Sequence, residues 1–304
     1  MSDPIVSVVV PTYERGALIR ASVASLLAQE GVDFEVIVVD DGSTDDTRER
    51  LAAIRDPRLR VIAAEHGGVA AARNAGMAAA RGRYVAFHDS DDEALPGRLA
   101  EPVAVLDGRP ELGLVIMNGI FLRPEDGDGA DEPWIKPTVT HTLAGRTIGV
   151  AEVFRWNLGQ LQGMCFTKKS LDATGPLDRT FRILDDLDLV LRVTARHRAV
   201  FLDVPAFSYR RHAGGIAQDR TAVREESIRL ADKLVRLHPE ILDVVGRQTF
   251  QRRQARRYAR LASMKVRAGE PAAARAALER ARALDPRNVR YRVQALWVRL
   301  RRQD

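Results

Sequence analysis

Apolar runs alternate with amphipathic segments along the first 118 residues, and this alternation is the strongest constraint on the fold. Continuous apolar runs of this length predict strands that are buried on both faces. Strands that are separated by helices predict parallel pairing within one sheet. The predicted strands are 5–10, 34–40, 59–64, 83–88 and 112–117, and the predicted helices between them are 17–29, 45–54 and 68–80.

The pattern changes after residue 118. Residues 119–147 are rich in Pro, Gly and acidic residues, which predicts a loop. Beyond the loop we expect a helix near 150–157, a strand near 161–167, a helix at 185–196 and a strand at 199–204. From about residue 220 onward the pattern is wholly helical.

We therefore predict an α/β domain with a mostly parallel, Rossmann-like sheet covered by helices on both faces, followed by an all-helical extension. The expected boundaries are 1–218 for the α/β domain, with halves 1–118 and 119–218, and 219–304 for the extension. No apolar run approaches 18 residues, so no transmembrane helix is expected. The N-terminal segment has an acid where a signal peptide needs a basic region, which predicts a cytoplasmic protein.

The charge is concentrated in the last part of the chain. Residues 247–304 hold 17 Arg and Lys against 4 Asp and Glu, a formal charge of +13, whereas the whole chain carries +6. The basic balance therefore belongs to the extension and gives no reason to expect nucleic acid as a partner of the main domain. The single cysteine, Cys165, excludes an internal disulfide and is expected to be buried.

Polar residues follow three of the predicted strands. Pro11-Thr12-Tyr13 follows the first, Asp40-Asp41 the second, and Asp89-Ser90-Asp91-Asp92 the fourth. Because ligands of such sheets bind at the carboxyl ends of the strands, these residues are the candidate site.

The crowded carboxylates at 89–92 suit a hard divalent cation, Mg²⁺ or Mn²⁺, which could in turn hold nucleotide phosphates. The alternative is a solvated acidic cluster before a helix. At Asp40-Asp41, turn formation and helix capping explain residues 42–46, but explain less well why two acids end a buried strand. A carboxylate there could accept a hydrogen bond from a nucleobase.

Three segments together resemble the N-terminal half of a family 2 glycosyltransferase. They are "VSVVVPTYERGALIRASVASLLAQ", "FEVIVVDDGSTDDT" and "HGGVAAARNAGMAAARGRYVAFHDSDD". The resemblance covers about 1–120 closely and 160–215 more loosely. It implies the GT-A fold, an inverting transfer from a nucleoside diphosphate sugar to a hydroxyl, and Mn²⁺ or Mg²⁺ as cofactor. Uridine diphosphate sugars are the commonest donors of the family.

The resemblance also implies roles for individual residues. The nucleotide-sugar pocket would include Pro11, Thr12, Tyr13, Glu14, Asp41, Arg73, Asp89 and Ser90, with Asp41 on the base and Arg73 near the diphosphate. Asp89-Ser90-Asp91 matches the DxD motif, so Asp91 and Asp89 would bind the metal, with His212 as a further ligand. His88 occupies a position that is usually apolar in the family.

In the second half, Asp185 and Asp186 begin a predicted amphipathic helix. Acids there also complement the helix dipole, which needs no catalytic role. By the resemblance, Asp186 is the catalytic base and Asp185 a neighbour that is structural or binds the acceptor. The acceptor itself stays open between a surface glycan, a lipid-linked sugar, a protein and a small molecule. Two alternatives are a non-catalytic nucleotide-sugar-binding protein and a nucleotidyltransferase.

The extension contains one segment, 255–286, that resembles a single tetratricopeptide-type helical hairpin. The segment after it mixes aromatic and aliphatic residues with many arginines. It is interpreted either as a solvated Arg-rich helix or as a contact with an anionic membrane surface.

Overall fold

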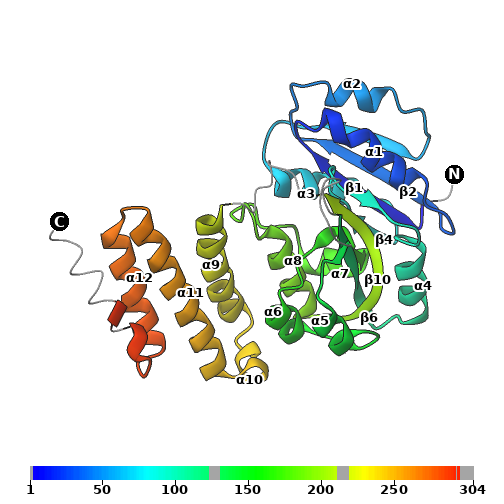
Figure 1. Ribbon diagram of the computed structural model, residues 1–304. Helices are drawn as coiled ribbons and strands as arrows, with labels where there is room; N and C mark the ends of the chain where they lie inside the picture. The colour runs from blue at the N-terminus through cyan, green and yellow to red at the C-terminus, as the bar shows by residue number, and fades with distance from the viewer. Residues whose placement is uncertain (1–2, 123–130, 211–218, 292, 295–304) are drawn as a thin grey trace. The chain divides into compact units, whose positions relative to one another are not determined.

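The computed structural model describes residues 3–122, 131–210, 219–291, 293 and 294, and Figure 1 shows the chain. The chain divides into two compact units, residues 1–215 and residues 216–304.

The first unit is built on one mixed sheet with the strand order β3-β2-β1-β4-β9-β6-β10-β5, with β7 beside β6 and β8 beside β10. Its strands are β1 (Val6–Thr12), β2 (Phe34–Asp40), β3 (Leu59–Ala63), β4 (Tyr84–Phe87), β5 (Glu93–Ala94), β6 (Leu112–Leu122), β7 (Glu132–Pro133), β8 (Thr147–Ile148), β9 (Met164–Thr167) and β10 (Arg198–Arg210). Pairing is parallel among β1 to β4 and between β6 and β10. Strand β9 runs antiparallel between β4 and β6.

The helices of this unit are α1 (Gly16–Leu27), α2 (Thr47–Ala52), α3 (Val69–Ala79), α4 (Ala100–Gly108), α5 (Pro137–Leu143), α6 (Val150–Trp156), α7 (Lys168–Thr174) and α8 (Asp185–Thr194), with a 3₁₀ turn at Leu161–Gly163. Ile19 of α1 and Val103 of α4 share a core cluster with Val8 of β1. Helix α3 packs on the other side of β1, where Gly76 faces Val9. The predicted α/β fold with helices on both faces is therefore confirmed.

The segment 119–147 is more ordered than the expected loop. Strand β6 continues to Leu122, and β7, α5 and β8 follow within the described part of the segment. Aromatic packing explains part of this order, because the ring of Phe121 stacks on Trp134 with centroids 4.3 Å apart. The side chain of Asn118 also bonds to the backbone of Ile135 in both directions. These contacts join residues too distant in sequence for a local pattern to reveal.

The second unit is helical, as predicted for the end of the chain. It contains α9 (Arg220–Leu237), α10 (Ile241–Val245), α11 (Arg247–Arg267) and α12 (Pro271–Leu284). Helices α11 and α12 form a hairpin whose turn includes Gly269 at φ +76°, a backbone conformation that favours glycine. Its core contains Ala262, Ala274 and Leu278. Over the described residues, no helix combines the length and apolar character that a membrane span requires.

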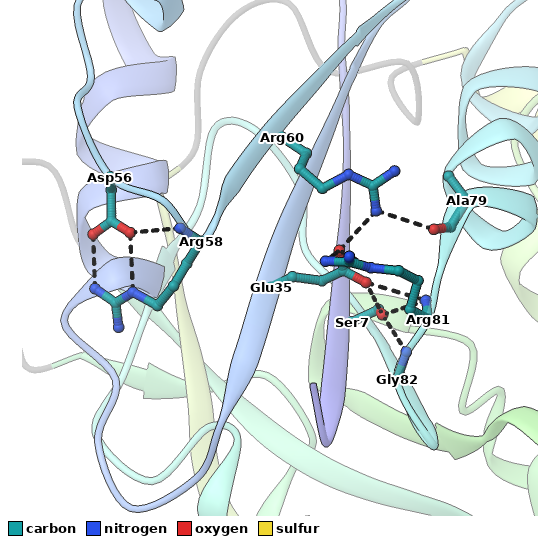
Figure 2. A network of polar contacts seen from close by, with 8 residues as sticks. All are labelled: Ser7, Glu35, Asp56, Arg58, Arg60, Ala79, Arg81 and Gly82. Carbon is teal, nitrogen blue, oxygen red and sulfur yellow. Dashed lines mark hydrogen bonds and ion pairs between the residues drawn. The ribbon is translucent and has the colours of Figure 1, made fainter. Parts of the chain in front are cut away.

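A network of ion pairs and hydrogen bonds connects the amino ends of the parallel strands, as Figure 2 shows. Glu35, at the start of β2, is 2% exposed. Its carboxylate accepts hydrogen bonds from Ser7 at 2.7 Å, Arg60 at 2.7 Å and Arg81 at 2.8 Å. The hydroxyl of Ser7 also accepts the backbone N–H of Gly82 at 2.8 Å. The network thus joins β1, β2 and β3 to the segment that enters β4.

Burial alone would raise the pKa of Glu35, and it is the largest single influence. Hydrogen bonds from Arg81, Arg60 and Ser7 together outweigh it and lower the pKa from 4.5 to about 2. A carboxylate whose folded-state pKa is lowered stabilises the fold fully above its unfolded value. That contribution is lost as the pH falls from about 4.5 to about 2.

We predict that Glu35→Gln lowers the free energy of unfolding at pH 7 by about 1–2 kcal/mol, a modest value because both arginine partners are partly exposed. Urea unfolding of both proteins at several pH values measures the effect. The difference between wild type and variant should shrink as the pH falls below about 4.5. Glu30→Gln, at an exposed position after α1, is the control. A difference independent of pH would contradict the assignment.

Candidate active site

Most of the candidate residues lie at the opposite edge of the sheet, where the strands β1, β2 and β4 end. Pro11 and Thr12 are the last residues of β1, and Tyr13 and Glu14 follow it. Asp41 follows β2, and Asp89, Ser90 and Asp91 follow β4 after His88. Arg73 lies on α3, and Asp186 lies in the first turn of α8. His212 lies outside the described residues.

Asp41 fixes the loop that leads into α3. Its two carboxylate oxygens accept the backbone N–H groups of Gly67 at 2.8 Å and Gly68 at 2.9 Å. The neighbouring Asp40 has different partners. Its carboxylate accepts hydrogen bonds from the backbone N–H of Ser43 and from the side chain of Arg48. A carboxylate oxygen can accept two hydrogen bonds, so Asp41 has acceptor capacity beyond the two glycine N–H groups.

His66 lies beside Asp41, although no sequence pattern singles it out. Its Nδ1 lies 3.0 Å from the backbone carbonyl oxygen of Asp41 and 3.0 Å from Oδ2. Its ring lies against Tyr13 with centroids 4.3 Å apart. Tyr13 is 43% exposed, so the pair presents aromatic surface to solvent at the carboxyl ends of β1 and β2. A planar ligand could stack on such a surface.

Glu14 connects the loops after β1 and β2. Its Oε1 accepts both the N–H and the hydroxyl of Thr44, at 3.0 and 2.8 Å, and its own N–H donates to Ser43. Its φ of +53° is rare for a residue with a side chain, and such outliers are typical of functional sites. In this conformation the Glu14 carboxylate is used to shape the two loops.

Arg73 links the two halves of the α/β unit. The guanidinium donates to Asp89 after β4 at 2.8 Å and to Asp185 at the start of α8 at 2.9 Å. Arg73 is 7% exposed and Asp185 only 2%. Burial alone would lower the pKa of Arg73, but the charges of Asp185 and Asp89 raise it above its usual value. The arginine is therefore firmly charged, and it neutralises two carboxylates from distant parts of the sequence.

The residues next to Arg73 strengthen the same connection. The side chain of Asn74 exchanges two hydrogen bonds with the backbone of Leu177, at 2.8 and 3.0 Å. One turn further, a Cβ at position 76 would lie 2.3 Å from the Cγ1 of Val9, so Gly76 lets α3 approach β1 closely. In the sequence Arg-Asn-Ala-Gly, Gly76 therefore lets α3 pack closely on the sheet. The side chains of Arg73 and Asn74 bond to Asp185 and Leu177, in the second half of the α/β unit.

Asp186 combines burial with negative neighbours. Its Oδ1 accepts the backbone N–H of Leu187 at 2.6 Å. Burial and the charge of Asp185 raise the pKa of Asp186 well above its usual value, although Arg73 and the Leu187 N–H act in the opposite direction. A carboxylate with a raised pKa is a better proton acceptor than an ordinary aspartate.

The acidic loop after β4 is not uniformly charged. Asp91 pairs with Arg15 at 3.4 Å, and Asp89 pairs with Arg73. Asp92 is 1% exposed, and neither of its carboxyl oxygens has a hydrogen bond of normal geometry within the described residues. Burial and the charges of Asp89 and Asp91 raise the pKa of Asp92 to about 9, although Gln162 lowers it. The raised pKa favours the neutral form of Asp92, and a neutral carboxyl group would reduce the repulsion between the acids of this loop.

Two buried basic residues, His88 and Arg98, contact the backbone at or next to the loop that follows β4. His88 is fully buried, and its Nε2 lies 3.1 Å from the backbone carbonyl oxygen of Asp92. Burial and the charge of Arg98 lower the pKa of His88 to about 4, so the ring is neutral. Arg98, also fully buried, donates to the carbonyl oxygens of Phe87 and Met164. It thereby joins the end of β4 to the start of β9.

The donor set suits a metal ion that is held jointly with a substrate. Among the described residues, no three His, Cys, Asp or Glu side chains converge as a metal site. Asp89 and Asp91 together offer two carboxylates. Mg²⁺ is commonly bound by one or two carboxylates together with substrate phosphates, so this pair fits such an ion and not an all-protein cage.

The sequence did not single out Arg15 or His66 as parts of this region. Arg15 and His66 lie in segments already quoted, "PTYERG" and "HGG", directly beside predicted residues. Proximity to those motifs was the available signal. Neither residue type alone indicates a ring contact or an ion pair with a loop 76 residues away.

The fold resembles solved structures along most of the chain. It matches TarS residues 1–349 of S. aureus in complex with UDP-GlcNAc with a TM-score of 0.70 and 20% identity, covering 96% of this chain and 88% of that one. It matches the mannosyltransferase PcManGT from Pyrobaculum calidifontis, in complex with GDP-Man and Mn²⁺, with a TM-score of 0.60 and 21% identity, covering 98% of this chain and 85% of that one. At these identities the likeness shows a shared fold.

Two relatives with named functions match parts of the sequence. The succinoglycan biosynthesis protein ExoO of Rhizobium meliloti is 49% identical over 127 residues, 40% of this chain and 36% of its own. The UDP-Glc:alpha-D-GlcNAc-diphosphoundecaprenol beta-1,3-glucosyltransferase WfgD of Escherichia coli is 36% identical over 107 residues, 35% of this chain and 42% of its own. The match thus spans less than half the length of either relative.

A longer match and a family profile complete the comparison. The uncharacterized protein MT1568 of Mycobacterium tuberculosis is 30% identical over 243 residues, 75% of this chain and 73% of its own. Residues 7–143, which hold Tyr13, Asp41, Arg73, Asp89 and Asp91, match the family described as glycosyl transferase family 2. The chain therefore belongs to glycosyl transferase family 2.

Proposed function

We propose that this protein transfers a sugar from a nucleoside diphosphate sugar to a hydroxyl acceptor, with inversion at the anomeric carbon. The observation that carries the proposal is the ion bridge of Arg73, which holds the Asp89 loop and the start of α8 at one place. The bridge brings the candidate donor residues and the candidate base, Asp186, to the same edge of the sheet.

The donor would bind across the ends of β1, β2 and β4. Tyr13 and His66 offer a stacking surface for the base, and Asp41 offers lone pairs to a base N–H. Pro11, Thr12 and Glu14 would shape the same pocket, and Asp89 and Ser90 would lie toward the sugar. A uridine base is the best-supported choice, because UDP-GlcNAc is the ligand of the TarS complex and UDP-Glc stands in the name of WfgD.

Asp186 would act as the general base. As the acceptor oxygen forms its bond to the anomeric carbon, the Asp186 carboxylate takes the hydroxyl proton and the bond to the diphosphate oxygen breaks with its electron pair. One carboxylate and direct displacement give inversion without a covalent intermediate. The raised pKa of Asp186 supports this role, because it increases the affinity of the carboxylate for the proton.

The leaving diphosphate gathers negative charge that the chain must stabilise. Arg15 and Arg73 lie beside the acidic loop and could contribute positive charge there. Asp91 and Asp89 would hold Mg²⁺ or Mn²⁺, with His212 proposed as a further ligand on the family resemblance alone. Such an ion supplies electrostatic stabilisation of the diphosphate. The Mn²⁺ in the PcManGT complex supports the choice of ion.

The acceptor is proposed to be a lipid-linked sugar or growing surface glycan, with a small molecule as the remaining choice. Support comes from the names of the relatives, which include succinoglycan biosynthesis and a diphosphoundecaprenol-linked acceptor. Such an acceptor would place the reaction at a membrane surface, which the basic C-terminal helices would favour. Most of the aromatic segment proposed for that contact, 295–304, lies outside the described residues.

We predict that UDP with Mn²⁺ raises the melting temperature by several degrees, since a ligand at 100 times its Kd adds about 2.7 kcal/mol to stability. Thermal-shift measurements with and without the metal test this. Asp91→Asn should lose the metal-dependent part of the shift. Tyr13→Ala should lose much of the shift that UDP gives without the metal.

Asp172→Asn, on an exposed part of α7, is the matched control and should behave as wild type. No shift with any nucleoside diphosphate would contradict the donor assignment. A full metal-dependent shift in Asp91→Asn would contradict the metal assignment alone.

We predict that Asp186→Asn keeps donor affinity but lowers kcat by roughly 10²-fold or more, because the acceptor proton loses its base. Since the raised pKa makes the ionised carboxylate unfavourable in the folded state, the variant should be at least as stable as wild type at pH 7. The acid limb of the wild-type pH profile of kcat/KM should give an apparent pKa above the ordinary range for aspartate. Near-normal turnover in a folded variant would exclude Asp186 as the base.

A further inference from the structure

A hollow in the helical unit is lined by cations and hydrogen-bonding groups. It has a volume of about 440 Å³ and lies between α11 and the segment that follows α12. Its polar lining includes Arg256, Arg260, Ser263, Asn288, Arg290 and Gln294. All the residues that line this hollow belong to the second unit.

The three arginines are placed to act together. Arg256 and Arg260 are one helical turn apart and lie on the same face of α11, and Arg290 faces them from the following segment. Within the described part of the chain, no carboxylate forms an ion pair with any of the three. The neighbouring acid, Asp285, is engaged with the Asn288 amide at 3.4 Å. The lining therefore carries positive charge that the described residues do not neutralise.

Further arginines increase the positive field beside the hollow. Burial, followed by the charge of Arg260, lowers the pKa of Arg224 on α9. Burial, followed by the charges of Arg253 and Arg224, lowers the pKa of Arg257 to about 10. Burial is the larger cause for both arginines, and Asp232 acts in the opposite direction on Arg257. The smaller contributions between the arginines show that these cations lie near one another, which favours an anion in their neighbourhood.

The hollow also contains a group that needs a hydrogen-bond donor. The amide oxygen of Gln294 is buried and has no hydrogen-bond partner among the described residues. Tyr291, a residue that is 5% exposed, belongs to the same lining. A buried acceptor without a partner is unfavourable, so a ligand hydroxyl at this place would satisfy it.

We propose that this hollow binds a phosphate group on a ligand that also carries a hydroxyl. Guanidinium groups match phosphate oxygens in geometry and charge. Three arginines suit a ligand phosphate, with its larger negative charge, better than they suit a ligand with one carboxylate. The Gln294 oxygen would accept the ligand hydroxyl. A soluble polyol phosphate and the headgroup of a glycerol-based phospholipid share this chemistry.

The test is titration calorimetry on the full chain with glycerol 3-phosphate, in EDTA so that metal-dependent binding elsewhere is silent. Arg256→Gln/Arg260→Gln should weaken binding by about tenfold or more, because charge-assisted hydrogen bonds are lost. Arg252→Gln/Arg267→Gln is the matched control, since both arginines are exposed on the same helix and outside the hollow.

A second arm uses phosphatidylglycerol vesicles, with phosphatidylcholine vesicles as the neutral reference. Loss of vesicle binding in the hollow variant, but not in the control variant, identifies a lipid headgroup as the source. Loss restricted to glycerol 3-phosphate identifies a soluble ligand. The proposal is overturned if neither probe binds, or if both arginine pairs reduce binding equally, because binding would then follow net charge alone.

Discussion

The organisation of the α/β unit depends on one buried cation. Arg73 reaches from α3 to Asp89, 16 residues away in sequence, and to Asp185, 112 residues away. Without that charge, Asp185 would be a buried carboxylate facing other acids, and breaking a buried ion pair is costly. The same interaction places the start of α8, and with it Asp186, beside the acidic loop. Stability and the proposed chemistry therefore rest on the same guanidinium.

The two edges of the sheet show two ways of treating buried charge. At the amino edge, Glu35 is fully compensated, and its pKa falls to about 2. At the carboxyl edge, Asp92 is left without a normal hydrogen bond among the described residues, and its pKa rises to about 9. A compensated carboxylate stabilises the fold, whereas an uncompensated one is a cost that functional sites often carry. The contrast supports the proposal that the chemistry lies at the carboxyl edge, and it does so without reference to any relative.

Much of the fold was predictable because the apolar runs are long and regularly spaced. The runs that became β1, β2 and β4 are continuous and buried, so their pattern is unambiguous. Residues 119–147 were predicted as a loop because their composition is polar. Their order comes from contacts such as Phe121 with Trp134, which depend on tertiary packing. The antiparallel direction of β9 likewise has no local signature.

The site residues also fall into those that local motifs indicate and those whose contacts depend on the fold. Tyr13, Asp41, Arg73 and Asp89 stand in motifs, so the family resemblance points to them. Their partners were harder to predict, because a pairing such as Arg73 with Asp185 depends on the folded path of the chain. The raised pKa of Asp92 also follows mainly from burial, which cannot be read from the sequence alone. His212 lies outside the described residues, so its proposed role rests on the resemblance alone.

A double-mutant cycle on Arg73 and Asp185 tests the central claim most directly. Urea unfolding of wild type, Arg73→Gln, Asp185→Asn and the double variant gives the free energy that couples the two side chains. The buried bridge predicts that each single change destabilises the protein, Arg73→Gln by about 3 kcal/mol. It predicts a coupling of about 1–3 kcal/mol, so that the double variant loses less than the sum of the two. Additive losses, equal to that sum within about 0.5 kcal/mol, would contradict the account.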